Sequence, residues 1–191
     1  MIKTTAILIE ELSNYKAPAN RISRLVKYGT YIPIVKGLYE TDKTTPGYLL
    51  AGSIYGPSYL SFDYALSHYG LIPEAVYSFT SATFEKKKAK KYETPFGNFL
   101  YRDVPALAYP LGVTLVKEGS YVYQIAIPEK AVCDKLYMMP PVNNKKDLQD
   151  LIFEDLRIDE REFYGLNGDY LLELSELYHC TNTKMLGRLL R

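Results

Sequence analysis

The chain has little of what metal centres, disulfide scaffolds and membrane spans require. Its 191 residues include two cysteines, Cys133 and Cys180, two histidines, His68 and His179, and no tryptophan. No two of these four residues have the spacing of zinc ligands, so we expect no metal site. No apolar run approaches the roughly 18 residues of a membrane span. An amphipathic segment follows Lys3 where a signal peptide would be apolar, so we expect a cytoplasmic protein with reduced thiols.

Overall charge is equally uninformative, because 23 Lys and Arg residues against 22 Asp and Glu residues give a net charge of +1. The distribution says more. Residues 1–44 hold seven basic and four acidic side chains, whereas residues 145–191 hold seven and ten. The chain therefore has a mildly basic beginning and a mildly acidic end. Tyrosine is abundant, with 19 copies. Its apolar ring and polar tip suit interfaces, although compositional bias is an equal alternative.

The first 44 residues have the pattern of a small winged-helix-like unit. A helix begins after Thr4 or Thr5, and a second is expected from about Asn20 to Tyr28, ended by Gly29. The β-branched and aromatic residues of segment 30–40 predict an edge strand with a tight wing turn. We call residues 1–44 the head.

The rest of the chain alternates between helical and strand-like periodicity. Helices are expected over 45–55, over 62–69 with Ser61 as the cap, and over 128–138. Strands are expected over 75–84, over 120–127 and on both sides of a turn at 94–98. Residues 145–191 predict three or four short helices, with caps at Asp159, Asn167 and Thr181. The sequence thus predicts an α+β fold with a winged-helix-like head (1–44), a mixed α/β body (45–142) and a helical tail packed on the body (143–191).

The second helix of the head has the residues of a DNA-reading helix. Arg21, Arg24 and Lys27 lie near one face at helical spacing, opposite the apolar side chains. Arginine pairs with guanine, and lysine neutralises phosphate, so this face suits the major groove. A solvated basic face is the alternative. The candidate DNA-binding residues are Asn20, Arg21, Ser23, Arg24, Lys27 and, in the expected wing, Lys36.

Four stretches in fixed order resemble the AbiEi family. Three of them, which we call motifs 1 to 3, are YLSFDYALSHYGLIPE (59–74), YETPFGNFLYR (92–102) and IAIPEKAVCDKLY (125–137), and IVKGLY (34–39) precedes them. The resemblance covers roughly residues 18–138. AbiEi proteins are antitoxins and transcriptional regulators of a bacterial type IV toxin–antitoxin system in phage defence by abortive infection. The resemblance implies a winged helix that binds the operon's own promoter, and a nucleotidyltransferase-like partner toxin, AbiEii, opposed without a stable complex.

The chain departs from the family at several points. Tyr69 stands where relatives often have histidine, and Ile127 where they commonly have serine. We interpret motif 1 as a packing element and the Lys130–Asp134 pair of motif 3, at i,i+4 spacing, as a modest stabiliser. Only one helix precedes Asn20, so the head is short of a three-helix core. Segment 45–55 completes that core in one interpretation; in the other, the head has lost DNA binding.

A dense lysine run, Lys86, Lys87, Lys88, Lys90 and Lys91, is expected in a loop or at the exposed end of a strand pair. It suits contact with nucleic acid or with an acidic face of a toxin; a solubilising loop is the alternative. Two other functions compete with the antitoxin. One is a stand-alone regulator without a toxin. The other is a nuclease-like enzyme using Glu85-Lys86-Lys87 with Mg²⁺. No glycine-rich phosphate loop, Ser-His-Asp order or Cys-His dyad is present, so we expect neither catalysis nor a cofactor.

Overall fold

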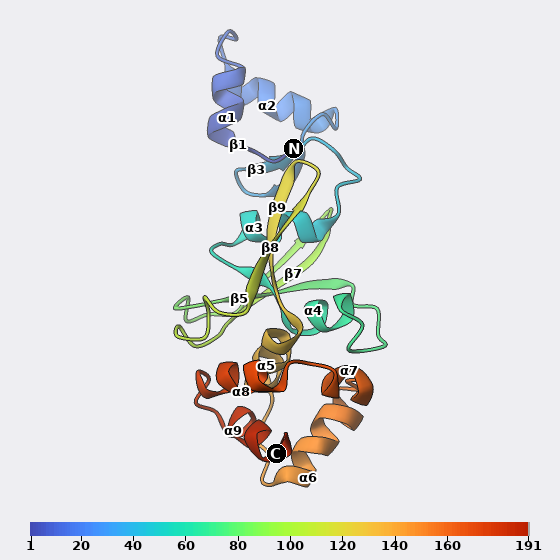
Figure 1. Cartoon of the computed structure of the whole chain (residues 1–191). Helices are drawn as coiled ribbons and strands as arrows, with labels where there is room; N and C mark the ends of the chain where they lie inside the picture. The colour runs from blue at the N-terminus through green and yellow to red at the C-terminus, as the bar shows by residue number, and fades with distance from the viewer. Residues whose placement is uncertain (191) are drawn as a thin grey trace.

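A computed structural model describes residues 1–190, in which head, central sheet and C-terminal helices follow one another along a long axis (Figure 1). Helices and mixed sheets occur together, which confirms the predicted α+β class. A hydrophobic core runs without a break from Ile34 in the head to Leu189 in the tail. No helix within residues 1–190 has the length and apolarity to cross a bilayer.

Both helices of the head form close to their predicted positions. Helix α1 spans Thr5–Glu11, and the Thr4 hydroxyl caps it by accepting a hydrogen bond from the N–H of Ile7 at 3.3 Å. Helix α2 spans Pro18–Lys27. It begins two residues earlier than expected because proline, which lacks an N–H group, is well suited to a helix's first turn. Gly29 follows α2 at φ +73°, the left-handed conformation of a C-terminal cap.

Segment 30–40 forms a hairpin instead of one strand. Strands β2 (Ile32–Val35) and β3 (Leu38–Glu40) are antiparallel, and Gly37 takes φ +85° in the turn between them. Strand β1 (Lys3–Thr4) pairs with the other side of β3, giving the order β1-β3-β2. Strand β2, which contains Pro33, is therefore an edge strand, as predicted.

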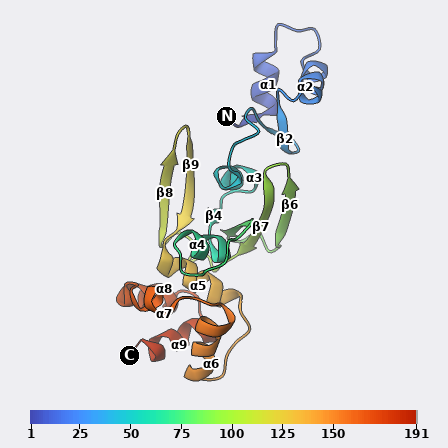
Figure 2. The same cartoon turned by 90° about the vertical axis from the view of Figure 1, so that its right-hand side faces the viewer.

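The body is built on a six-stranded sheet of order β6-β7-β5-β4-β9-β8. Its strands are β4 (Tyr59–Leu60), β5 (Ser78–Thr83), β6 (Lys90–Thr94), β7 (Gly97–Asp103), β8 (Val113–Glu118) and β9 (Tyr121–Ala126). The turn between β6 and β7 confirms the hairpin predicted from its proline and glycine. Strand β8 was not predicted. It pairs with β9 along its whole length as the second hairpin of the sheet (Figure 2).

The helix predicted over 45–55 forms at the expected place but is shorter and irregular. A 3-10 turn at Gly47–Leu50 runs into a single helical turn, α3 (Ala51–Ile54). Gly47 packs so tightly that a β-carbon there would lie 2.2 Å from the Phe79 ring and 2.4 Å from the Phe96 carbonyl oxygen. The segment packs on β4 and β9 of the body, so it does not complete the helical core of the head.

Helix α5 (Pro128–Met138) matches its prediction, and α4 (Phe62–His68) ends one residue early, before Gly70 at φ +73°. Ser61 holds the cap position of α4, but its hydroxyl does not cap the helix. It donates instead to Asp134 Oδ2 at 2.6 Å. The side chain of Thr80 takes over the cap, accepting from the N–H of Tyr64 at 3.0 Å.

Where three or four helices were predicted, the described part of the tail, up to residue 190, contains four α-helices: α6 (Lys145–Gln149), α7 (Glu160–Tyr164), α8 (Gly168–Glu176) and α9 (Thr181–Leu189). A π-helical turn at Asp150–Asp155 extends α6. Asp159 and Asn167 cap α7 and α8 with their side chains, as expected. The cap predicted at Thr181 is wrong, because Cys180 precedes α9 and Thr181 is the first helical residue.

The Lys130–Asp134 pair is a buried junction between body and tail, not a surface pair. Both side chains are fully buried, with Lys130 Nζ 3.4 Å from Asp134 Oδ1. Lys130 also donates to the Ala108 carbonyl and the Tyr178 hydroxyl, each at 2.6 Å. Asp134 accepts from the Tyr178 and Tyr59 hydroxyls, at 2.5 and 3.0 Å, in addition to Ser61. Burial lowers the pKa of Lys130, and the adjacent Asp134 carboxylate opposes that shift.

Head and body meet at Glu40, the last residue of β3, which is fully buried. The hydroxyl of Tyr121, at the start of β9, donates to its carboxylate at 2.8 Å. Burial alone would raise the pKa of Glu40. The hydrogen bonds from the terminal amine, from Tyr121 and from the N–H groups of Thr41 and Asp42 outweigh that effect and lower the pKa.

The buried tyrosines should make the fold sensitive to alkali. Burial raises the pKa of Tyr59, Tyr101 and Tyr178 above the ordinary value of 10, and the Asp134 carboxylate raises those of Tyr59 and Tyr178 further. In the unfolded chain these tyrosines ionise near pH 10, whereas in the folded chain they stay protonated. Their contribution to the free energy of unfolding is therefore fully present below pH 10 and is lost as the pH rises above it. Guanidinium unfolding at a series of pH values should show this loss, and Tyr101→Phe should reduce its slope. A free energy of unfolding that is constant above pH 10 would contradict the prediction.

Candidate nucleic-acid interface

The solvent-facing side of α2 carries most of the predicted DNA-binding residues. Asn20, Ser23, Arg24 and Lys27 are all exposed, and Ile22 on the opposite side is buried in the head. The Ser23 hydroxyl donates to the Ala19 carbonyl, one turn earlier, at 3.2 Å. Within residues 1–190, no ion pair neutralises Arg24 or Lys27. The charges of this face are therefore available to an anionic partner.

Arg21 differs from the other predicted residues because it is half-buried. Its guanidinium carbon lies 5.1 Å from the centre of the Tyr15 ring, a cation–π contact. Its Nε is buried and has no hydrogen-bond partner within the described residues. Arg21 therefore contributes to the packing of the head as well as to its positive charge, whereas Arg24 contributes mainly charge.

The hairpin after α2 brings the last predicted residue to the surface. Lys36 is exposed in the turn between β2 and β3, next to Gly37. Helix α2 and this hairpin both belong to the head, which stands at one end of the molecule, away from the tail (Figure 1). A duplex can therefore approach the head without meeting the tail.

Three residues that the sequence analysis did not select also belong to this surface. Tyr15 and Lys16 line a shallow depression together with Asn20, Arg21 and Arg24. Tyr28, just after α2, is 80% exposed. Tyrosine hydroxyls and lysine amines commonly donate to phosphate oxygens. The only signal in the sequence was their position, because Tyr15 and Lys16 lie within three residues of the start of α2 and Tyr28 directly follows its end.

The lysine run lies in the loop before β6 and in the first residues of that strand, as predicted. It is less uniform than the sequence suggests. Lys86 turns inward, donating to the Gly56 carbonyl at 3.2 Å with its Nζ 5.3 Å from the Tyr55 ring centre. Lys91 pairs with Glu93 at 2.7 Å. Among residues 1–190, no ion pair or side-chain hydrogen bond engages the ammonium groups of Lys87, Lys88 and Lys90, so these three carry the available charge.

The lysine run and the head form two separate basic surfaces. The last two lysines of the run are the first residues of β6, and the other end of β6 leads into the turn to β7. Gly47, which closely follows the head in sequence, packs against Phe96 in that turn. The length of β6 therefore separates the run from the head side of the sheet, as Figure 2 shows. The lysine run and the head therefore need not contact the same short segment of nucleic acid.

The nuclease-like arrangement gains no support from the geometry. Glu85 is exposed, and Lys86 turns away from it toward Gly56. The nearby Asp103 carboxylate already accepts from the Thr83 hydroxyl and the Lys87 N–H, both at 2.6 Å. Over residues 1–190, no group of three or more His, Cys, Asp or Glu side chains is placed to hold a metal ion. Cys133 is buried, with Sγ 3.8 Å from the Leu171 carbonyl oxygen, and burial raises its pKa.

Comparison with protein-family models and with curated proteins finds no match to this chain.

Proposed function

We propose that the chain is a DNA-binding transcriptional regulator that represses its own promoter and serves as the antitoxin of an AbiE-like type IV system. The observation that carries the DNA-binding part is the exposed, unpaired basic face of α2 beside the Lys36 hairpin, set at one end of the molecule. A helix of this kind beside a hairpin is the arrangement with which winged-helix proteins enter the major groove and contact the backbone.

The antitoxin part of the proposal rests on the resemblance of motifs 1 to 3 to AbiEi proteins. In this scheme the head occupies DNA, and the lysine run is left for an RNA that the toxin modifies or for the toxin itself. The separation of the two basic surfaces supports this division of labour. A stand-alone regulator would use only the head, so the two alternatives differ in whether the lysine run has a function.

Binding of the purified chain to the DNA upstream of its own gene tests the proposal. We expect a gel shift at lower protein concentration with this DNA than with an unrelated fragment of equal length. Four neutralised phosphates, one for each of Arg21, Arg24, Lys27 and Lys36, would weaken binding about 100-fold between about 50 and 200 mM salt. Equal affinity for both fragments at every salt concentration would contradict specific promoter binding.

Co-expression with the product of a neighbouring nucleotidyltransferase-like gene tests the antitoxin part separately. Growth arrest by that product, relieved by this chain, is the expected result. The lysine run is then tested by changing Lys88 and Lys90 to alanine, because both side chains are exposed and, within residues 1–190, form no ion pair or side-chain hydrogen bond. Promoter binding without any rescue of growth would favour the stand-alone regulator.

A further inference from the structure

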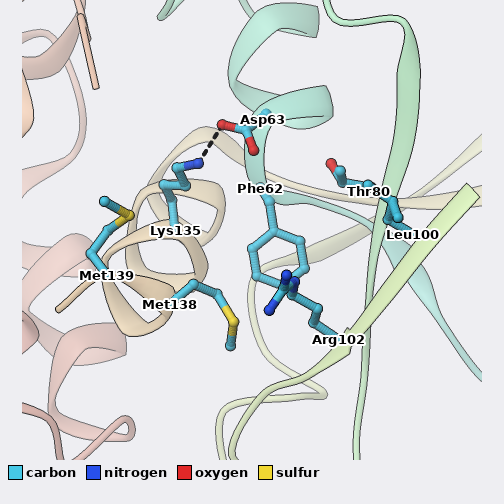
Figure 3. A pocket seen from close by; sticks show the side chains of 8 residues that line it. All are labelled: Phe62, Asp63, Thr80, Leu100, Arg102, Lys135, Met138 and Met139. Atoms are coloured by element: carbon cyan, nitrogen blue, oxygen red, sulfur yellow. Dashed lines mark hydrogen bonds and ion pairs between the residues drawn. The ribbon is translucent and has the colours of Figure 1, made fainter. Parts of the chain in front are cut away.

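The three motifs converge on a pocket that the DNA-binding proposal leaves unused. The pocket has a volume of about 270 Å³ and lies between the sheet of the body and helix α5 (Figure 3). Motif 1 contributes Phe62 and Asp63, motif 2 contributes Leu100 and Arg102, and motif 3 contributes Lys135, while the end of α5 adds Met138. The fold thus brings together side chains from three stretches that are far apart in the sequence.

The apolar part of the pocket suits a flat ring. Phe62 is almost fully buried, and Figure 3 shows the Met138 thioether turned toward its ring. Phe62 also holds its backbone at φ +53°, a conformation that bulky residues rarely adopt. Strain of this kind persists where the surrounding structure fixes it, and it clusters at ligand sites. Aromatic rings and thioethers both pack favourably against the faces of other rings.

The polar part of the pocket carries a net positive charge. Lys135 Nζ lies 2.5 Å from Asp63 Oδ1, so these two charges cancel each other. Arg102 is exposed, and within residues 1–190 no ion pair or side-chain hydrogen bond engages its guanidinium. Two cations and one carboxylate leave one positive charge, located on Arg102. Figure 3 shows Lys135 beside Asp63, apart from the Arg102 guanidinium, which overlaps the edge of the Phe62 ring in this view.

We propose that this pocket binds a single nucleoside monophosphate unit, either a free nucleotide or the terminal nucleotide of an RNA strand. The base packs against Leu100 and Met138, which are partly exposed, whereas the buried Phe62 ring supports the wall of the pocket. The phosphate pairs with the Arg102 guanidinium, whose planar fork matches phosphate oxygens. The Lys135–Asp63 pair, which also lines the pocket, offers a donor and an acceptor to the polar edge of the base. A pocket of 270 Å³ is at the small end of ligand sites, so it admits one nucleotide rather than a dinucleotide.

Calorimetric titration of the full chain with AMP and UMP tests the site. We expect saturable binding with a dissociation constant below about 1 mM, and weaker binding of the bare nucleoside and of inorganic phosphate. Arg102→Gln should weaken nucleotide binding about tenfold or more, because it removes a charged hydrogen-bonding partner. The matched control is Arg161→Gln, which changes an exposed arginine on α7, away from the pocket, and should bind like the wild type. Unchanged thermal unfolding of both variants shows that they are folded.

A short single-stranded RNA distinguishes the two sources of the ligand. If it displaces AMP in an Arg102-dependent manner, the site takes strand ends; if only the mononucleotide binds there, the site takes free nucleotides. Absence of saturable nucleotide binding below about 1 mM would overturn the proposal. So would equal binding by the Arg102→Gln and Arg161→Gln variants. Because the titration contains no promoter DNA, its outcome is independent of the proposed role of the head.

Discussion

Asp134→Asn is expected to lower the free energy of unfolding by about 3–5 kcal/mol, because it leaves the buried Lys130 ammonium without its counter-charge. The carboxylate is fully buried and accepts hydrogen bonds from Tyr178, Tyr59 and Ser61 besides pairing with Lys130. An asparagine of the same shape keeps part of this hydrogen bonding but not the charge. Guanidinium unfolding followed by circular dichroism measures the change as a shift in midpoint at constant slope.

Asp63→Asn is a matched control for this prediction. Asp63 also pairs with a lysine of α5, Lys135, but its side chain is 40% exposed and that of Lys135 17% exposed. Water screens such a pair, so its loss should cost about 1 kcal/mol or less. Similar effects of the two substitutions would contradict the assignment of Asp134 as the counter-charge of a buried lysine.

A double substitution separates the cost of an unpaired charge from the loss of packing. Lys130→Met combined with Asp134→Leu removes both charges and keeps apolar volume. Such replacements of buried ion pairs are often neutral or even stabilising. The double variant should therefore be more stable than Asp134→Asn, although the hydroxyls of Tyr59, Ser61 and Tyr178 lose their acceptor. A double variant less stable than the single one would show that the hydrogen bonds, and not the charge pair, hold the junction together.

Local signals in the sequence predicted those elements whose ends are fixed by local chemistry. Pro128 fixes the start of α5, Thr4 and Asp159 cap their helices, and the glycines at 29 and 37 adopt the left-handed conformations expected of them. Each of these features depends on residues that lie within a few positions of one another in the sequence. Proximity along the chain is sufficient information for such features.

Local sequence signals did not predict the buried junction around Lys130 and Asp134, because its hydrogen-bonding partners are far apart in the sequence. Ser61 and Tyr59 are more than 70 residues from Asp134, and Tyr178 is 44 residues away. A serine before a helix predicts a cap, yet here the hydroxyl donates to a buried carboxylate, and Thr80 of β5 caps instead. Likewise, an i,i+4 Lys–Asp pair has the same sequence pattern whether it faces water or the core. The pocket at Phe62 was missed for the same reason, since three motifs form it only in the folded chain.

Loss of the basic face of α2 should have the largest effect on promoter binding. Arg24→Ala is expected to weaken binding by about 1–3 kcal/mol if the guanidinium reads a base, with relaxed specificity at that base pair. Lys27→Ala should weaken binding to all sequences and reduce the salt slope by about 0.9, the contribution of one phosphate. Neither substitution should alter thermal unfolding, because both side chains are exposed. Gel shifts at several salt concentrations measure both effects.

Arg21→Ala provides the contrast within the same helix. Its guanidinium lies over Tyr15 and is half-buried, so this substitution should weaken DNA binding and also lower the melting temperature of the head. The control is Lys88→Ala with Lys90→Ala, which removes two exposed charges from the lysine run and should leave promoter specificity unchanged. If the variant lacking both Arg21 and Arg24 binds the promoter as tightly as the wild type, α2 does not read DNA. The head would then be a two-helix unit without that function, since segment 45–55 packs on the body and supplies no third helix.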